Sequence, residues 1–378
     1  MSRIFKLHRS EAGNLLNFAK GLAILLVFLH HYSRSAWISR GLPTPALLQF
    51  SYESPIQDFA LLAAAVRAGH FTEVFLRAMA HFGYVGVHLF VMLSGLGLAL
   101  GYGKNISVVA FLMRRAVKMT PPFWISVAFF ALLAWTTGSP FSASQILERM
   151  FLLTTFNPEH FFIIDSPLWC LAVFLQVHLL FLPLRRIIVR FGLPALLPLA
   201  AVDILWRTVA SMPRIVGWNP YFGHSVALNW LAIFGLGIWI GNRFRQHGEL
   251  AIPARAIAAA VLVAIPVAVM GAFSIFAYPA LDTALGLLIT VFAFAAFRVA
   301  SGTMVARVFG AVGIVSFPLY LYHRPLVTKI VHIWSNHHAA LPPVSLGFAL
   351  AALLTVALLL AQRTLRLRPA VSAWILGQ

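Results

Sequence analysis

Residues 14–34 read NLLNFAKGLAILLVFLHHYSR, an apolar run long enough to cross a bilayer as a helix. The run carries one lysine, Lys20, near its start and two histidines, His30 and His31, near its end. Ionisable side chains are costly in hydrocarbon, so residues of this kind inside a span indicate a functional site.

Lys20 and His31 are eleven residues apart, and a helix that turns about 100° per residue returns them to nearly the same face. The rise of about 1.5 Å per residue separates them by roughly 16 Å along the helix axis. His30 points about 80° away from this face. The Lys20–His31 pair predicts a site for a long substrate, with an anionic head near Lys20 and a reactive end near His31.

The composition is that of an integral membrane protein. Of 378 residues, 61% are hydrophobic and 10% are charged, whereas soluble domains contain about 25% charged residues. We therefore predict an all-α, polytopic membrane protein. It has about ten transmembrane helices, in the windows 15–35, 79–101, 121–137, 168–184, 192–210, 226–242, 256–275, 279–297, 309–333 and 343–362.

The distribution of Lys and Arg predicts the orientation, because positively charged loops are retained in the cytoplasm. A cytoplasmic N-terminus places most of the 28 basic residues in cytoplasmic segments. With an even number of spans, the C-terminus is cytoplasmic too. The net charge of +18 is then explained by topology, and no nucleic-acid partner is expected.

Further polar side chains fall inside the predicted spans. An ion at the centre of a span costs roughly 2.5–3.5 kcal/mol on insertion scales unless it is paired or lines a wet cavity. Each such residue either makes a structural hydrogen bond or contributes to a site, and the sequence leaves both readings open. These residues are His88, Gln176, His178, Asp203, Asp282 and His323.

The stretch 111–124, FLMRRAVKMTPPFW, combines basic residues with a Pro-Pro pair. Pro121 and Pro122 are expected to open a helix, which leaves 102–120 as a cytoplasmic turn. Arg115 and Lys118 would face one way on a helical turn and could grip a phosphate-bearing ligand. On charge alone, a simple topology anchor is the favoured explanation of the same residues.

Glycines in two spans are interpreted as helix-packing positions. No strand precedes them, and their spacing does not match the GxGxxG pattern of nucleotide-binding turns. Small residues let helices in membranes approach closely. The positions are Gly95, Gly97, Gly101, Gly237 and Gly241.

Several stretches, taken in order, resemble the membrane-bound acyltransferase 3 family, which includes O-acetyltransferases of bacterial surface polysaccharides. Lys20 and His31 match the family's opening cation, ten residues and histidine, with Lys in place of the usual Arg. Residues 83–95, GYVGVHLFVMLSG, are similar to its GxxGV(D/E)LFFVLSG, with His88 where an acid is usual.

Two further stretches carry the resemblance. Residues 115–123 match a basic R-x-x-R pair ahead of a Pro-Pro-aromatic helix start, again with one Lys. Residues 316–325, SFPLYLYHRP, match the late SxxLYL(W/Y)HxP pattern and contain Tyr320 and His323.

The middle motif is the weaker match. Residues 168–180, LWCLAVFLQVHLL, resemble LWSLSVEEQFYLL, but Phe174 and Leu175 replace both glutamates, so no role is carried over for those acids. The resemblance extends from residue 14 to about residue 327. It implies one membrane-embedded acyltransferase domain over 1–378, without a soluble C-terminal domain.

The resemblance implies transfer of an acyl group, expected to be acetyl, from cytoplasmic acyl-CoA to a hydroxyl of a cell-surface glycan or lipid-linked sugar. The expected location is the bacterial cytoplasmic (inner) membrane, with membrane lipids around the protein. Acyl-CoA is the donor substrate, and neither a cofactor nor a metal is expected.

His31 is the candidate base, because a neutral histidine in the bundle can accept the hydroxyl proton. His323 is a second candidate catalytic residue, and Lys20, Arg115 and Lys118 are candidates for holding the donor phosphates. The positioning candidates are Tyr320, His88 and Gln176.

Three alternatives remain open. The single cysteine excludes an internal disulfide and a cysteine-based metal site, but Cys170 is a possible acyl-carrying nucleophile. A haem-bearing electron carrier would use the intramembrane histidines as axial ligands. A proton-coupled transporter would use them with Asp203 and Asp282 as a relay.

Overall fold

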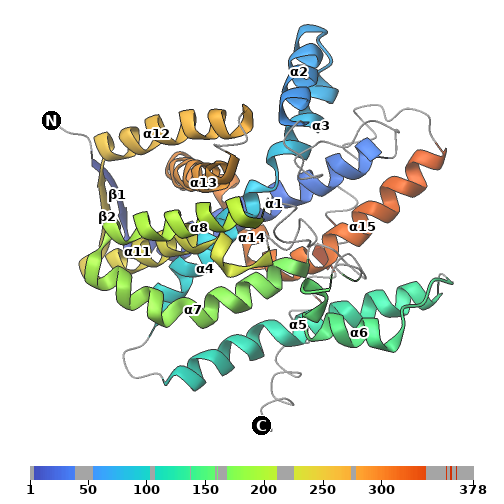
Figure 1. Cartoon of the computed structure of the whole chain (residues 1–378), viewed down its shortest axis with the longest axis horizontal. Helices are drawn as coiled ribbons and strands as arrows, with labels where there is room; N and C mark the ends of the chain where they lie inside the picture. The colour runs from blue at the N-terminus through green and yellow to red at the C-terminus, as the bar shows by residue number, and fades with distance from the viewer. Residues whose placement is uncertain are drawn as a thin grey trace.

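A computed structural model describes most of the chain and shows a nearly all-helical protein (Figure 1). The described residues are 4–38, 54–102, 107–136, 138–157, 168–210, 225–273 and 278–337, with 160, 355, 358, 359 and 363. The long helices are α1 (Ala12–Ile38), α4 (Val85–Gly101), α5 (Val108–Thr136), α7 (Trp169–Phe191), α8 (Leu196–Ala210), α11 (Leu231–His247), α12 (Ala254–Phe273), α13 (Tyr278–Ala300) and α15 (Ser316–His337). The shorter elements are β1 (Ile4–His8), η1 (Arg9–Glu11), α2 (Ser54–Arg67), α3 (Phe71–Phe82), α6 (Ala143–Met150), η3 (Leu153–Thr155), η5 (Leu193–Ala195), η6 (Ala227–Asn229), β2 (Glu249–Pro253) and α14 (Met304–Ile314).

A two-stranded sheet joins the N-terminal segment to the connection between α11 and α12. β1 pairs with β2 in antiparallel register, and the Lys6 ammonium lies 2.8 Å from the Glu249 carboxylate. In Figure 1, α1 starts beside this sheet and runs to the opposite end of the molecule. The sheet therefore holds two predicted cytoplasmic segments at the same end. Which side of the membrane that end faces stays a prediction.

The centre of the bundle is built from α1, α4 and α11, with backbones in close approach. A methyl group added to Gly237 would overlap the Met92 carbonyl, and one added to Gly95 would overlap the Phe234 carbonyl. The predicted packing role is confirmed for these glycines and for Gly241, which faces Ala99. The described residues do not support this role for Gly97 and Gly101, because a methyl group at either would meet none of their atoms within 4 Å.

The prediction of ten single spans is confirmed only in part. Within the described residues, six helices are long and apolar enough to cross a membrane, or up to eight if each of two bent pairs counts as one span. The predicted span 79–101 is one such pair, α3 and α4, bent by 42°, and 309–333 is the other, α14 and α15, bent by 75°. The window 343–362 lies almost wholly outside the described residues.

The helix α5 begins earlier than the sequence predicts. Ser107 accepts a hydrogen bond from the Ala110 N–H at its start, and the helix continues through Pro121 and Pro122. The expectation that these prolines open a helix is therefore wrong. The cap at Ser107 has started the helix before the prolines are reached, so Arg115 lies on a helix and not in a turn.

Candidate functional site

His31 of α1 and His323 of α15 lie side by side, with ring centroids 5.0 Å apart. The two residues are far apart in the chain, and the packing of α15 against α1 brings them together. His323 is fully buried, whereas His31 is half-buried. The structure thus places the two candidate catalytic residues in one site.

A backbone contact fixes the tautomer of His323. Its Nδ1 lies 2.7 Å from the carbonyl oxygen of Tyr320. Because a carbonyl can only accept, Nδ1 must carry the proton, and a neutral ring then has its lone pair on Nε2. Nε2 is buried and has no hydrogen-bond partner among the described residues. His323 therefore presents an oriented nitrogen that can accept a proton.

The neighbours of this pair have structural contacts of their own. The His30 ring lies 4.9 Å from that of His31, but His30 faces α3 and α4, where a methyl group at Gly83 would contact its Cβ. The Tyr320 ring lies 5.4 Å from His323, and its side chain hydrogen-bonds Cys170, which is buried. Tyr320 thus orients His323 through its carbonyl and contacts Cys170 through its side chain.

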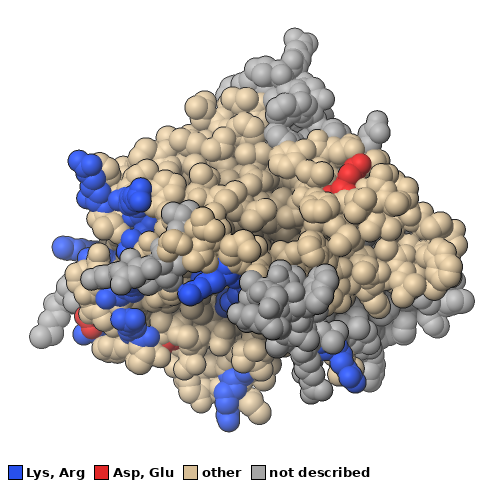
Figure 2. All heavy atoms as spheres, turned by 90° about the horizontal axis from the view of Figure 1, so that it is seen from below, with Lys and Arg blue, Asp and Glu red and all other residues tan. Residues whose placement is uncertain are grey.

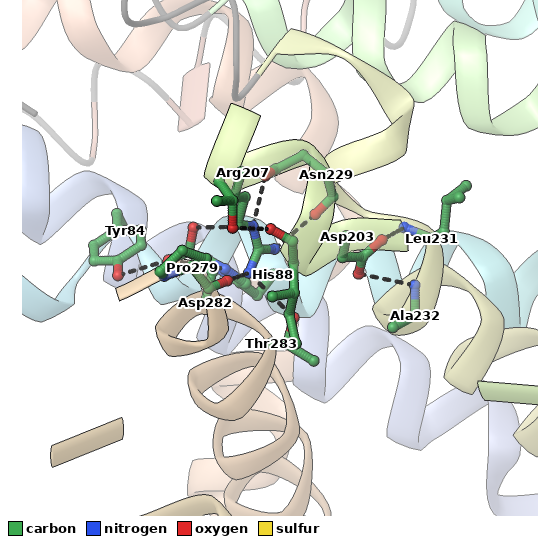
Figure 3. A network of polar contacts seen from close by, with 12 residues as sticks. Tyr84, His88, Asp203, Arg207, Asn229, Leu231, Ala232, Pro279, Asp282 and Thr283 are labelled. Carbon is green, nitrogen blue, oxygen red and sulfur yellow. Dashed lines mark hydrogen bonds and ion pairs between the residues drawn. The ribbon is translucent and has the colours of Figure 1, made fainter. Parts of the chain in front are cut away.

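A second buried polar group lies between α4, α8 and α13 (Figure 3). The Asp282 carboxylate accepts a hydrogen bond from Tyr84 at 3.0 Å and lies 3.6 Å from His88 and 3.8 Å from Arg207. Arg207 also donates to the side chain and carbonyl of Asn229 and to Pro279 and Thr283. We call this group the Arg207 network.

The sequence does not predict the Arg207 network. Arg207 reads as a loop residue there, yet its side chain is 7% exposed within the bundle. The sequence does show one arginine, Arg207, and two acids, Asp203 and Asp282, within apolar stretches. Such residues are expected to form pairs, but the sequence does not indicate which residue pairs with which. His88 lies in this network, where it contacts Asp282 and the Trp230 ring.

Two other residues singled out in the sequence, Asp203 and Gln176, make hydrogen bonds to backbone groups. The Asp203 carboxylate accepts from the N–H groups of Leu231 and Ala232, at 2.9 and 3.1 Å, and so caps the N-terminus of α11. The Gln176 amide donates to the Ser225 carbonyl and accepts from the Ala227 N–H. These contacts give both residues a structural role in fixing the chain before α11. Because the Asp203 carboxylate is used as a helix cap, these contacts do not support its role as a proton relay in the transporter alternative.

The candidate phosphate-binding residues lie on α1 and α5. Lys20 is half-buried on α1, and no hydrogen bond or ion pair of its ammonium group is recorded within the described part of the chain. The Arg115 guanidinium lies 5.6 Å from the centroid of the Phe111 ring. Arg115 and Lys118 are close enough to His178 for their charges to act on it, and His178 contacts Ser94 at 2.8 Å.

The described residues hold no group of three or more His, Cys, Asp or Glu side chains that is placed to bind a metal ion. A comparison with family models matches the acyltransferase domain of the acyltransferase 3 family to residues 14–362. No curated protein and no solved structure matches the chain. The match covers nearly the whole chain and contains the histidine pair and the basic residues of α1 and α5. This protein, a membrane acyltransferase, belongs to the acyltransferase 3 family.

Proposed function

We propose that this protein transfers an acyl group, expected to be acetyl, from cytoplasmic acyl-CoA to a hydroxyl of a cell-surface glycan or lipid-linked sugar. The expected location is the bacterial cytoplasmic membrane. The observation that carries the proposal is the contact between His31 and His323, with the buried Nε2 of His323 left as an acceptor. Acyl transfer to a hydroxyl needs such a base.

One imidazole of this pair can serve as both the base and the acid that acyl transfer needs. One imidazole accepts the hydroxyl proton while the acceptor oxygen attacks the thioester carbon. The tetrahedral intermediate then collapses, the carbon–sulfur bond breaks, and the imidazolium returns the proton to the leaving thiolate. The products are the ester and free CoA. The two rings contact each other, so either imidazole is placed to stabilise charge on its neighbour.

The distance between the cation Lys20 and the base His31 fits the elongated shape of acyl-CoA. Lys20 and His31 lie on one helix, roughly 16 Å apart along its axis. Gly83, just before α4, packs against His30, and Gly86 of α4 packs against Ala23, so α4 runs antiparallel to α1. The C-terminal end of α4 therefore lies at the Lys20 end. Acyl-CoA has an anionic nucleotide on a long arm, and binding the nucleotide at this end directs the thioester toward His31.

Two measurements test the proposal. Purified protein in lipid nanodiscs should release CoA from acetyl-CoA only when acceptor glycan is present, with radiolabelled acetyl appearing in the glycan. Cells that lack the gene should lose one ester from a surface glycan, and the wild-type gene should restore it. Labelled acetyl that stays in acetyl-CoA across a panel of surface glycans, together with unchanged glycan esters in the deletion strain, would refute the proposed activity.

A further inference from the structure

Arginines from two helices converge on the C-terminal end of α4. The Arg185 guanidinium of α7 lies 4.7 Å from the centroid of the Tyr102 ring, just beyond the last residue of α4. Arg245 of α11 donates from Nη1 to the Ala99 carbonyl at 3.4 Å. Ala99 and Tyr102 are only three residues apart, so the guanidiniums that contact them lie near each other at this helix end. Two like charges are thus held together at one helix end.

An aromatic cluster contacts both Arg185 and a third arginine, Arg115. The rings of Tyr102, Phe111 and Phe181 lie 5.2 to 6.2 Å from one another, and Phe111 stacks on Phe181. Arg115 of α5 lies over Phe111 at 5.6 Å. Guanidiniums are attracted to ring faces, so this cluster holds Arg115 and Arg185 in place before any ligand binds.

The sequence supplies no acid to neutralise these charges on the helices that carry them. There is no Asp or Glu between residues 74 and 147 or between 166 and 202, and none in α11. Glu249, the acid closest to Arg245 in sequence, pairs with Lys6. The C-terminal dipole of α4 contributes only about half a negative charge.

The arginines also retain unused donors. The Nε atoms of Arg115 and Arg185 are buried and have no hydrogen-bond partner within the described part of the chain. On the face shown in Figure 2, a group of Lys and Arg side chains lies toward the end of the molecule that carries the β1–β2 sheet in Figure 1, with few Asp or Glu side chains among them.

We propose that Arg115, Arg185 and Arg245 form a binding site for the phosphate groups of the nucleotide end of acyl-CoA. This inference rests on the proposed function and extends the donor site to α7 and α11, beyond the residues that the sequence indicates. Guanidinium suits the site because its fork matches phosphate oxygens in pairs. Three helices each contribute one arginine, so the site exists only in the folded bundle.

The test measures binding of CoA to the full-length protein in nanodiscs of zwitterionic lipid. Arg185→Gln and Arg245→Gln should each weaken binding roughly tenfold to hundredfold, the value of one charge-assisted contact to phosphate. Arg186→Gln is the matched control for Arg185. It removes the same charge from the neighbouring, exposed position and should bind CoA as the wild type does. Size-exclusion elution and the thermal midpoint of each variant verify that it is folded.

Donor analogues identify the part of the ligand that is bound. In the transfer assay, Arg185→Gln should raise the KM for acetyl-CoA and leave unchanged the KM for acetyl-pantetheine, which lacks the nucleotide and phosphates. Equal CoA affinity in Arg185→Gln, Arg245→Gln and Arg186→Gln would overturn the inference. It would also be overturned if the difference appeared only in phosphatidylglycerol nanodiscs, because the ligand would then be a lipid headgroup.

The two proposals fail in different ways. Wild-type transfer activity with unchanged CoA binding in the arginine variants removes this site and leaves the proposed function standing. CoA binding that depends on the arginines, without transfer to any acceptor, refutes the proposed function and supports the site.

Discussion

Two buried polar side chains in the described part of this bundle, Arg207 and His323, differ in how completely their hydrogen bonds are satisfied. In the Arg207 network, the guanidinium donates to four groups and also lies beside Asp282. In the histidine pair, the buried Nε2 of His323 has no hydrogen-bond partner in the described part of the chain. Buried polar groups are normally paired, so one that is oriented and left unpaired is a candidate for binding substrate. The Arg207 guanidinium stabilises the bundle, and His323 is available for chemistry. His88 of the network also has both ring nitrogens buried without a hydrogen-bond partner among the described residues, but its Nε2 lies 3.6 Å from the Asp282 carboxylate.

The largest expected effect is on activity at the histidine pair. His31→Ala and His323→Gln should each lower kcat by about 10²- to 10⁴-fold, the usual contribution of a general base. Neither variant should lose membrane insertion, because the Arg207 network stays intact. The measurement is acetyl transfer in membranes with matched expression.

His30→Gln is the control for the histidine pair, because His30 packs toward Gly83 and away from His323. It should retain substantial activity. If His30 proves indispensable while His31 proves dispensable, the assignment of the base is wrong.

The next effect is on stability at the Arg207 network. Arg207→Met leaves the buried Asp282 carboxylate without the guanidinium beside it and the Asn229 side chain without the donor from Arg207, and breaking a buried pair in this way costs about 3–5 kcal/mol. The thermal midpoint in detergent should fall, while the kcat of the remaining folded protein changes little. Arg190→Met, at an exposed position on α7, is the control.

A double variant separates charge from packing in the same network. Arg207→Met with Asp282→Leu should recover part of the lost stability, because the uncompensated carboxylate is removed. A stable Arg207→Met protein without transfer activity would move this network from the structural group to the catalytic one.

A smaller effect is expected at Gln176. Gln176→Leu removes the side-chain partners of the Ser225 carbonyl and the Ala227 N–H, and each buried group left unsatisfied costs about 1–3 kcal/mol. Gln176→Glu keeps the acceptor and loses the donor, so its thermal midpoint should lie between those of the leucine variant and the wild type. Equal midpoints for wild type and Gln176→Leu would show that the amide is not needed to hold this segment.

The sequence predicts what depends on spacing along a single helix. Lys20 and His31 are placed on one face by helical geometry alone, and Gly237 is correctly assigned to packing. Contacts between helices follow from tertiary arrangement, so the sequence does not pair Arg207 with Asp282, 75 positions later in the chain.

Sequence rules for where a helix starts and for how long an apolar span is also fail at two places. Pro121 and Pro122 are good helix starters, yet Ser107 caps α5 well before them. The apolar window 309–333 looks continuous, but α14 ends at Ile314 and α15 starts at Ser316 at an angle of 75°. Hydropathy alone reports apolar length, and it cannot reveal a bend between two apolar helices.

The smallest effect is expected at the Lys6–Glu249 pair, which is exposed to solvent and joins β1 to β2. The hydrogen bond from Lys6 lowers the pKa of Glu249 below its usual value, so the pair contributes stability above that value and loses it as pH falls through the lowered pKa. Glu249→Gln should therefore melt only slightly below wild type at neutral pH, since exposed ion pairs contribute little. The two proteins should melt together once the pH is below the lowered pKa of Glu249, and added salt should also reduce the difference. The measurement is a pair of thermal melts at each pH and at low and high salt. A large gap at neutral pH that persists in acid would show that Glu249 is needed for the strand pairing itself and not for its charge.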